Sequence, residues 1–291
     1  MFKKRKTVAE NPFRMDMLPH DRKALWLDVV KLHYLELVVM GLTLFVFALP
    51  LLLNMLATNG YIAGVSEAQY GAMVEMVSVS QVTSALVNIP LLAIFAVGLS
   101  GVLRVCRQYA WGEVVTVSRD FALGIKQNWK QTVALLAVFG TVYASCVYAD
   151  VLAAMNPLSK MQYVASAWTM IAVVFLLPIG AYMLVCLAVY NNTFWQNFTQ
   201  GFALLMKVPF RTLGGVACFG GLFALFLIPN TSVHFALAVI LLLGAPFLLL
   251  GWFLFSYNQL DKFVNAQKHP QLVNKGLYLE GDIQDGEDES L

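Results

Sequence analysis

Residues with catalytic chemistry are few in this sequence and lie far apart. The chain contains no HExxH, GxSxG, GxGxxG or phosphate-binding GxxxxGK[ST] pattern. His33 and His234 fall on opposite sides of the topology predicted below, and no serine, histidine and aspartate form a set. The four cysteines make no CxxC pair and are interpreted as small apolar helix residues. We therefore predict a protein that is not an enzyme and that binds neither a metal nor a cofactor.

A small polar set is the candidate for ligand binding: Asp150, His234, Asn54 and Asn88. Each is expected toward the outer end of a membrane-spanning helix, and Asp150 lies about 18 residues, or about 27 Å, into its helix. Ionisable groups at the centre of a bilayer cost about 2.5–3.5 kcal/mol on insertion scales. The predicted spans have none there, which argues against an ion-coupled pump. Two interpretations stay open: the four residues contact headgroups and water, or they converge on a shallow vestibule that binds a small polar solute.

The composition indicates that lipid is the solvent of the elements that carry these residues. Of the 291 residues, 59% are hydrophobic and 12% are charged, and the mean hydropathy is +0.69. Soluble domains carry about 25% charged residues. A chain this apolar could not cover its own surface with polar groups. The sequence therefore predicts a multi-pass protein of the cell membrane with an all-α bundle as its fold.

Long uncharged runs define six predicted spans, because a membrane helix needs about 20 apolar residues. The run 212–260 is long enough for two spans, and Pro229-Asn230-Thr231 is the natural break. A basic segment (1–33) precedes the transmembrane domain (34–257), and a tail (258–291) follows it, acidic and predicted to be disordered after about residue 276. The predicted spans cover residues 35–57, 82–103, 132–153, 164–189, 212–228 and 233–256.

The distribution of Lys and Arg predicts the orientation of the bundle. Of the 19 basic residues, eight precede the first span, five lie between the second and third spans, two lie between the fourth and fifth, and three follow the last. Only Lys160 lies on the other side. Because basic loops stay on the cytoplasmic side, both termini are expected in the cytoplasm.

Two of the cytoplasmic loops have the pattern of amphipathic helices that lie in the headgroup plane. In 111–130 and in 192–207, aromatic and aliphatic residues fall mainly on one face and polar residues on the other. The residues expected to form these interfacial helices are Trp111, Phe121, Lys126, Trp129 and Lys130 in the first, and Trp195, Phe198, Phe202 and Lys207 in the second.

A motif in the first of these loops recurs in the second. Phe121-Ala122-Leu123-x-Ile125-Lys126 matches Phe202-Ala203-Leu204-x-Met206-Lys207, and Gly140 matches Gly221 at the same offset. The match predicts a parallel internal repeat, in which span, interfacial helix and span occur twice in the same direction. Inverted repeats, by contrast, are common in secondary transporters.

Three short stretches also carry a resemblance to a known family. The first span ends in Phe47-Ala48-Leu49-Pro50, a basic loop runs from Arg104 to Arg107, and Asp120-Phe121 is followed by Ile125-Lys126-Gln127-Asn128-Trp129-Lys130-Gln131. Over residues 30–260 the chain resembles the YesL-like proteins, a family of multi-span bacterial membrane proteins without an established activity. The resemblance implies a bacterial membrane protein, often found near carbohydrate-uptake systems, with no catalytic residues to carry over.

Together these features predict a non-enzymatic integral membrane protein that acts as an accessory or regulatory component of a bacterial membrane system. Its expected partners are the lipid bilayer and either another membrane protein or a second copy of the chain, and no nucleic acid. The alternative is a permease or transport subunit that moves a small polar solute. A polar cavity across the middle of the membrane would favour the permease, whereas a solid apolar core would favour the accessory protein.

Overall fold

The structure is a computed structural model that describes residues 19–65, 67–156, 160–221 and 231–278, and every regular element in this part of the chain is a helix. The prediction of an all-α fold is confirmed. Segments η2 and η4 are π-helical, and η5 is a short 3-10 helix. In chain order the elements are α1 (Arg22–Leu32), α2 (Tyr34–Gly64), α3 (Glu67–Ala110), α4 (Val117–Met155), α5 (Met161–Ile171), η2 (Ala172–Leu176), α6 (Leu177–Val189), α7 (Phe194–Lys207), α8 (Pro209–Gly220), α9 (Thr231–Leu260), η4 (Asp261–Asn265), α10 (Ala266–Lys268) and η5 (Pro270–Leu272).

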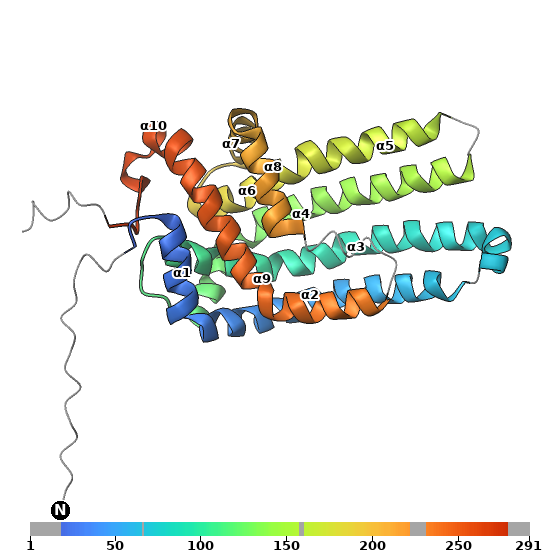
Figure 1. Ribbon diagram of the computed structural model, residues 1–291, viewed down its shortest axis with the longest axis horizontal. Helices are drawn as coiled ribbons and strands as arrows, with labels where there is room; N and C mark the ends of the chain where they lie inside the picture. The colour runs from blue at the N-terminus through green and yellow to red at the C-terminus, as the bar shows by residue number, and fades with distance from the viewer. Residues whose placement is uncertain (1–18, 66, 157–159, 222–230, 279–291) are drawn as a thin grey trace, which may run out of the picture.

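Two long helical hairpins form the body of the molecule (Figure 1). One pairs α2 with α3, and the other pairs α4 with the continuous run of α5, η2 and α6. Helix α3 has 44 residues and α4 has 39. These correspond to about 66 Å and about 58 Å of helix at about 1.5 Å per residue. Both lengths exceed the hydrocarbon core of a bilayer, which is about 30 Å thick, so both helices are long enough to extend beyond it.

Several helices of the described chain are long and apolar enough to cross a membrane. Four qualify by themselves, Tyr34–Ile62, Val74–Ala110, Val117–Met155 and Met161–Val189, and the bent pair α7 and α8 makes a fifth if it is counted as one span. Each of the first four predicted spans falls inside one of these helices. The predicted span 212–228 begins in α8 and its second half lies outside the described residues, whereas 233–256 falls within α9.

The first predicted interfacial helix, 111–130, is not a separate element. Residues 117–130 form the first part of α4, which continues without a break to Met155. Phe121, expected at the lipid surface, is 9% exposed and belongs to the apolar core. The prediction was wrong because the apolar face of this segment packs against a neighbouring helix of the same chain, and periodicity alone does not distinguish a protein partner from lipid.

Two glycines allow this close approach of α3 and α4. A Cβ atom on Gly101 would lie 2.6 Å from Cδ2 of Phe121, and a Cβ atom on Gly124 would lie 2.8 Å from the carbonyl oxygen of Ser100. Both distances are too short for real carbon atoms, so the helices contact each other only because these positions have no side chain. The pairing of α3 and α4 therefore depends on small residues rather than on large apolar ones.

Replacing Gly124 with alanine is expected to lower the free energy of unfolding by about 1–3 kcal/mol. The added methyl group would meet backbone atoms that cannot rotate away, including Cα of Gly101 at 2.9 Å. Gly214→Ala is the matched control, because a Cβ atom there has nothing within 4 Å and helix propensity alone predicts a gain of up to about 1 kcal/mol. Unfolding of the purified chain in mixed micelles measures both. Equal effects of the two substitutions would contradict the close α3–α4 contact.

The second predicted interfacial segment is present as a separate helix, α7. It begins with a capping box, in which the Thr193 side chain accepts a hydrogen bond from the backbone N–H of Gln196. The chain then bends by 107° into α8. Trp195 and Phe202 are 72% and 45% exposed, whereas Phe198 packs against a small apolar cluster of the bundle. A sharp bend together with exposed aromatic side chains is the geometry expected of a helix at a membrane interface.

The two halves of the predicted internal repeat have different conformations. Residues 121–130 lie within uninterrupted α4, whereas residues 202–211 contain the bend between α7 and α8. Gly140 packs against Ile89, but a Cβ atom on Gly221 would meet nothing within 4 Å. The sequence match therefore has no counterpart in the local structure of these segments.

A polar network closes the end of the bundle that carries most of the basic residues. Arg22 on α1 donates hydrogen bonds to Asp261 at 2.9 Å, to the carbonyl oxygen of Ala110 at 2.7 Å and to that of Lys275 at 2.8 Å. Its guanidinium carbon lies 4.4 Å from the ring centroid of Tyr257. One arginine thus joins α1, the end of α3 and the described C-terminal segment.

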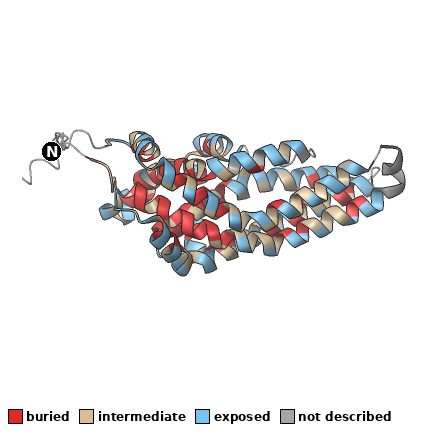
Figure 2. Ribbon diagram, turned by 90° about the horizontal axis from the view of Figure 1, so that it is seen from below, coloured by how far each residue is buried: buried red, intermediate tan, exposed pale blue. Residues whose placement is uncertain are grey.

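Buried residues gather at this end of the molecule (Figure 2), where Figure 1 places α1 and α10. The segment after residue 258, predicted as the start of a tail, belongs to this packed end as far as residue 278. The backbone N–H of Tyr278 donates to the carbonyl oxygen of Pro19 at 3.1 Å. The tail beyond it, predicted to be disordered, lies outside the described residues. The large apolar side chains of this core include Leu37, Met40, Leu103, Tyr182, Leu250 and Phe253.

Candidate functional site

A polar cavity of about 320 Å³ lies between α2, α3 and α4, and we call it the vestibule. Most of the side chains around it are polar, although the three helices are apolar enough to span a membrane. Polar groups inside such helices are costly and are therefore candidates for function. The vestibule is lined by Met55, Thr58, Asn59, Ile62, Gln81, Ser84, Ala85, Asn88, Tyr143, Val147 and Asp150.

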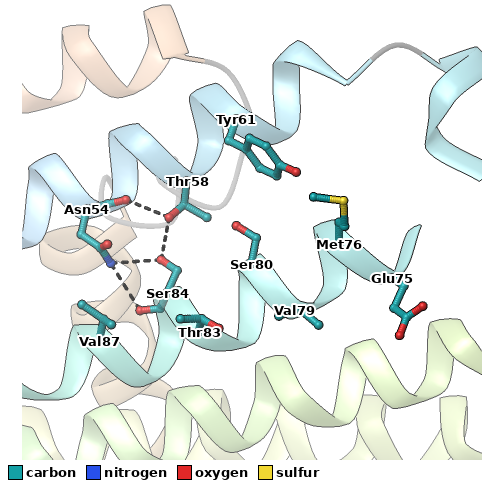
Figure 3. Close-up of a pocket in the computed structure, with 10 residues that line it drawn as sticks. All are labelled: Asn54, Thr58, Tyr61, Glu75, Met76, Val79, Ser80, Thr83, Ser84 and Val87. Atoms are coloured by element: carbon teal, nitrogen blue, oxygen red, sulfur yellow. Dashed lines mark hydrogen bonds between the residues drawn. The ribbon is translucent and has the colours of Figure 1, made fainter. Parts of the chain in front are cut away.

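A hydrogen-bond network centred on Asn54 joins α2 and α3 beside the vestibule. The Nδ2 atom of Asn54 donates to Oγ of Ser84 at 3.0 Å and to Oδ1 of Asn88 at 2.8 Å. The hydroxyl of Thr58, one turn further along α2, donates to Oγ of Ser84 at 2.7 Å. Figure 3 shows Asn54, Thr58 and Ser84 pointing toward one another across the two helices. Because these amide and hydroxyl groups bond to one another, the two helices are held in a fixed register.

A second cavity, which we call the lateral groove, lies on the other side of this network between α2 and α3. Its volume is about 640 Å³, and it shares Thr58 and Ser84 with the vestibule. Glu75 is the only charged side chain among the described residues that line the lateral groove. Asp150 is the only charged side chain among those that line the vestibule. Within the described ranges, no three His, Cys, Asp or Glu side chains lie close enough to hold a metal ion. The lateral groove is lined by Asn54, Thr58, Tyr61, Glu75, Met76, Val79, Ser80, Thr83, Ser84 and Val87 (Figure 3).

The vestibule lies far from the basic end of the bundle. Asn88 is about 24 Å from Arg104 along α3, and Asp150 is about 30 Å from Lys130 along α4, at about 1.5 Å per residue. The hydrocarbon core of a bilayer is about 30 Å thick. If the basic side chains mark one boundary of that core, the vestibule lies at the opposite boundary.

Tight apolar packing closes the vestibule on the side that faces the basic end. Its lining ends at Asn88 on α3. Further along this helix, Ala96, Leu99 and Val102 are 0%, 3% and 0% exposed. The ring of Phe47 fills the space beside Gly98, where a Cβ atom would lie 2.6 Å from Cγ of that ring. The described residues therefore form a vestibule above a solid apolar core rather than a polar path across the bundle.

The structure brings three of the four predicted ligand-binding residues together. Asn54 is hydrogen-bonded to Asn88, and Asn88 and Asp150 line the same cavity. The side chain of His234, the fourth residue, lies outside the described part of the structure.

Sequence reasoning missed other side chains of the vestibule, although a signal for them was present. Thr58 lies four residues after Asn54, and Ser84 lies four residues before Asn88. Residues at this spacing share a helix face, so each helix presents a short polar stripe toward the other. Tyr143 had no such signal, because a tyrosine in an apolar run is also typical of a membrane interface.

Trp111, predicted to anchor an interfacial helix, lies instead within the packed basic end. The cationic groups of Arg107 and Lys275 lie 4.7 Å and 3.7 Å from its ring centroid. Its Nε1 donates to the hydroxyl oxygen of Tyr257 at 3.0 Å. The indole is therefore fixed by two cationic side chains and by a hydrogen bond at its edge, which corrects the prediction of a lipid-facing side chain.

The other predicted interfacial residues are mostly exposed. Lys126, Trp129 and Lys130 lie on the surface of the first part of α4, and Nζ of Lys130 is 5.9 Å from the ring centroid of Trp129. Lys207 ends α7, and its Nζ is 5.2 Å from the ring centroid of Phe263. These exposed cations and aromatic side chains lie at the basic end of the bundle, where contact with headgroups is expected.

Comparison of the chain with models of protein families, with curated proteins and with solved structures gave no match in any of the three. The class of the protein therefore rests on its own residues. The described part of the chain is all-helical, and four of its helices, or five if the bent pair α7 and α8 is counted as one span, are long and apolar enough to cross a membrane. The resemblance to the YesL-like proteins stays a prediction.

Proposed function

We propose that the chain is a non-enzymatic, multi-pass protein of a bacterial cell membrane. In this proposal it serves as an accessory or regulatory component of a membrane system and binds a small polar solute in the vestibule. The resemblance to the YesL-like family suggests carbohydrate uptake as that system. The observation that carries the proposal is a polar vestibule that ends on a solid apolar core.

The membrane topology of the proposal has six spans and both termini in the cytoplasm. Four spans correspond to the helices of spanning length, while the predicted spans 212–228, which begins in α8, and 233–256, within α9, are the other two. Helix α9 has 30 residues and no Asp, Glu, Lys or Arg. Arg104, Lys130 and Lys207 then share the cytoplasmic side, as the preference of basic residues for that side requires. The vestibule opens on the outer side.

The apolar floor of the vestibule favours a binding protein over a carrier. A permease needs a solute path through the middle of the membrane, and transporter sites lie near the bilayer midplane. Here the buried residue Ala96, about 12 Å from Arg104 along α3 at about 1.5 Å per residue, lies near that depth. A protein that senses or presents a solute at the outer boundary, and passes the effect to a partner, needs no such path. The permease is the alternative function, because one state of a carrier would also present a vestibule on the outer side.

Reconstitution of the purified chain distinguishes the two functions. We expect solute binding without solute flux into sealed proteoliposomes. We also expect a stable membrane-protein partner when the tagged chain is recovered from gently solubilised membranes and the recovery is repeated through a tag on the partner. A helical membrane protein of similar size with the same tag is the control for non-specific recovery. Solute flux together with the absence of a partner would overturn the accessory function and establish the permease.

A further inference from the structure

The charge of the vestibule restricts the solutes that it can hold. Among its described lining residues Asp150 is the only charged side chain, and no described residue forms an ion pair with it. The adjoining lateral groove adds a second carboxylate, Glu75, and no basic side chain. Like charges repel most strongly where protein and lipid lower the dielectric constant. Anionic solutes are therefore disfavoured, and a cation would meet a complementary carboxylate.

The face of α4 that lines the vestibule has a pattern suited to a cation. Tyr143, Val147 and Asp150 follow one another at helical spacing and all line the cavity. An aromatic ring attracts a cation through the negative potential of its face. The carboxylate of Asp150, about two turns further along the same helix, supplies the counter-charge. The two groups thus give the cavity an aromatic surface and an acceptor for a cationic solute.

Asn88 adds a requirement for an oxygen atom in the ligand. Its side chain is 4% exposed and lines the vestibule. Oδ1 accepts from Asn54, which fixes the orientation of the amide. With Oδ1 engaged in this way, the Nδ2 group is the donor that the Asn88 side chain brings to the cavity, and a buried donor is favourable when it faces an acceptor. A hydroxyl or ether oxygen of a bound solute would satisfy it.

We propose that the vestibule binds a small organic cation that also carries an oxygen acceptor, the chemistry of a protonated amino alcohol. Asp150 accepts from the ammonium group, Tyr143 supplies an aromatic wall of the cavity, and Asn88 donates to the oxygen. The cavity volume of about 320 Å³ is at the lower end of the range for ligand pockets, about 300–1,000 Å³, which suits a small solute. This inference rests on the proposed solute-binding role of the vestibule and names the class of solute.

Three probes with the same two-carbon framework test whether the vestibule prefers a cationic solute. Ethanolamine, ethylene glycol and glycolate each have two carbons and a hydroxyl group, and they are cationic, neutral and anionic at pH 7. Equilibrium dialysis with the full chain in lipid nanodiscs is expected to rank ethanolamine first and glycolate last. Propylamine, which keeps the ammonium group and replaces the hydroxyl with a methyl group, is expected to bind more weakly than ethanolamine because Nδ2 of Asn88 then has no acceptor.

Two matched variants test the role of Asp150. Asp150→Asn removes the charge from an exposed side chain and is expected to weaken ethanolamine binding about tenfold, as expected for loss of a hydrogen bond to a charged group. Glu75→Gln removes a carboxylate that lines the lateral groove and not the vestibule, and is expected to change binding by about twofold at most, because it does not contact the solute and salt screens charges at longer range.

The outcomes separate this inference from the proposed function. Equal binding of ethylene glycol and ethanolamine, or tightest binding of glycolate, overturns the cation and leaves a solute-binding vestibule. Unchanged ethanolamine binding by Asp150→Asn overturns the role of that residue. If none of the probes binds, the inference is overturned. The recovery of a partner from membranes tests the proposed function independently of this result.

Discussion

Replacing Arg22 with methionine is expected to lower the free energy of unfolding by about 3–5 kcal/mol. The substitution leaves the carboxylate of Asp261, which is 5% exposed, without its cationic partner. It also removes the donor from the carbonyl oxygens of Ala110 and Lys275. A buried charge without a counter-charge carries its full desolvation cost, and the remaining hydrogen bond from Asn265 offsets only part of it.

Two further variants make this prediction specific. Lys275→Gln removes an ion pair of 3.1 Å with Glu113 and a cation–π contact with Trp111 at a side chain that is 35% exposed, and exposed contacts of these kinds contribute about 0–1 kcal/mol each. The double variant Arg22→Met with Asp261→Leu removes both charges and is expected to recover most of the loss. Unfolding in mixed micelles measures all three. A loss below about 1 kcal/mol for Arg22→Met, or a double variant less stable than the single one, would contradict a buried pair that links the chain ends.

The spans were predictable because they depend on hydrophobic length, a property that each segment carries by itself. The four helices of spanning length contain the first four predicted spans. Their true lengths were not predictable, since α3 continues through Glu75 and Gln81, residues that a hydropathy criterion excludes. Such polar ends are helical because they pair with a neighbouring helix, which is information that no single segment contains.

The segment 111–130 shows the same limit of prediction from a single segment. Its periodicity predicts an apolar face, and Phe121 is indeed covered. What covers it is α3 rather than lipid, and the reason lies at Gly101, in a different helix. The buried pair of Arg22 and Asp261 was equally invisible in the sequence, because its members come from opposite ends of the described chain.

The candidate site was predicted in part. Asn54, Asn88 and Asp150 were recognisable because amide and carboxylate side chains are rare in apolar helices. The sequence could not show that they share one region, because this depends on the register of α2 against α3 and of α3 against α4. Gln81 and Tyr143 join the site through that register alone.

Replacing Gly276 with alanine is expected to release the C-terminal segment 270–278 from the bundle. Gly276 has a φ of +84°, a conformation that costs other residues about 1–3 kcal/mol. A Cβ atom there would lie 2.5 Å from the carbonyl oxygen of Ala110 and 2.8 Å from the backbone nitrogen of Gly112. Overpacking against atoms that cannot rotate adds about 1–3 kcal/mol. When both costs add, the free energy that holds the segment on the bundle falls by about 2–6 kcal/mol.

The loss is expected to appear as local opening rather than as global unfolding, because the segment packs on the outside of a preformed core. Hydrogen exchange of the Tyr278 amide, which donates to the carbonyl oxygen of Pro19 at 3.1 Å, is the most direct measurement. Its protection should fall by about a hundredfold for each 2.7 kcal/mol, while the amides of α2 and α3 keep theirs. Gly60→Ala is the matched control, since a Cβ atom there meets nothing within 4 Å. Unchanged protection at Tyr278 in Gly276→Ala would mean that the docking of this segment does not depend on the glycine turn.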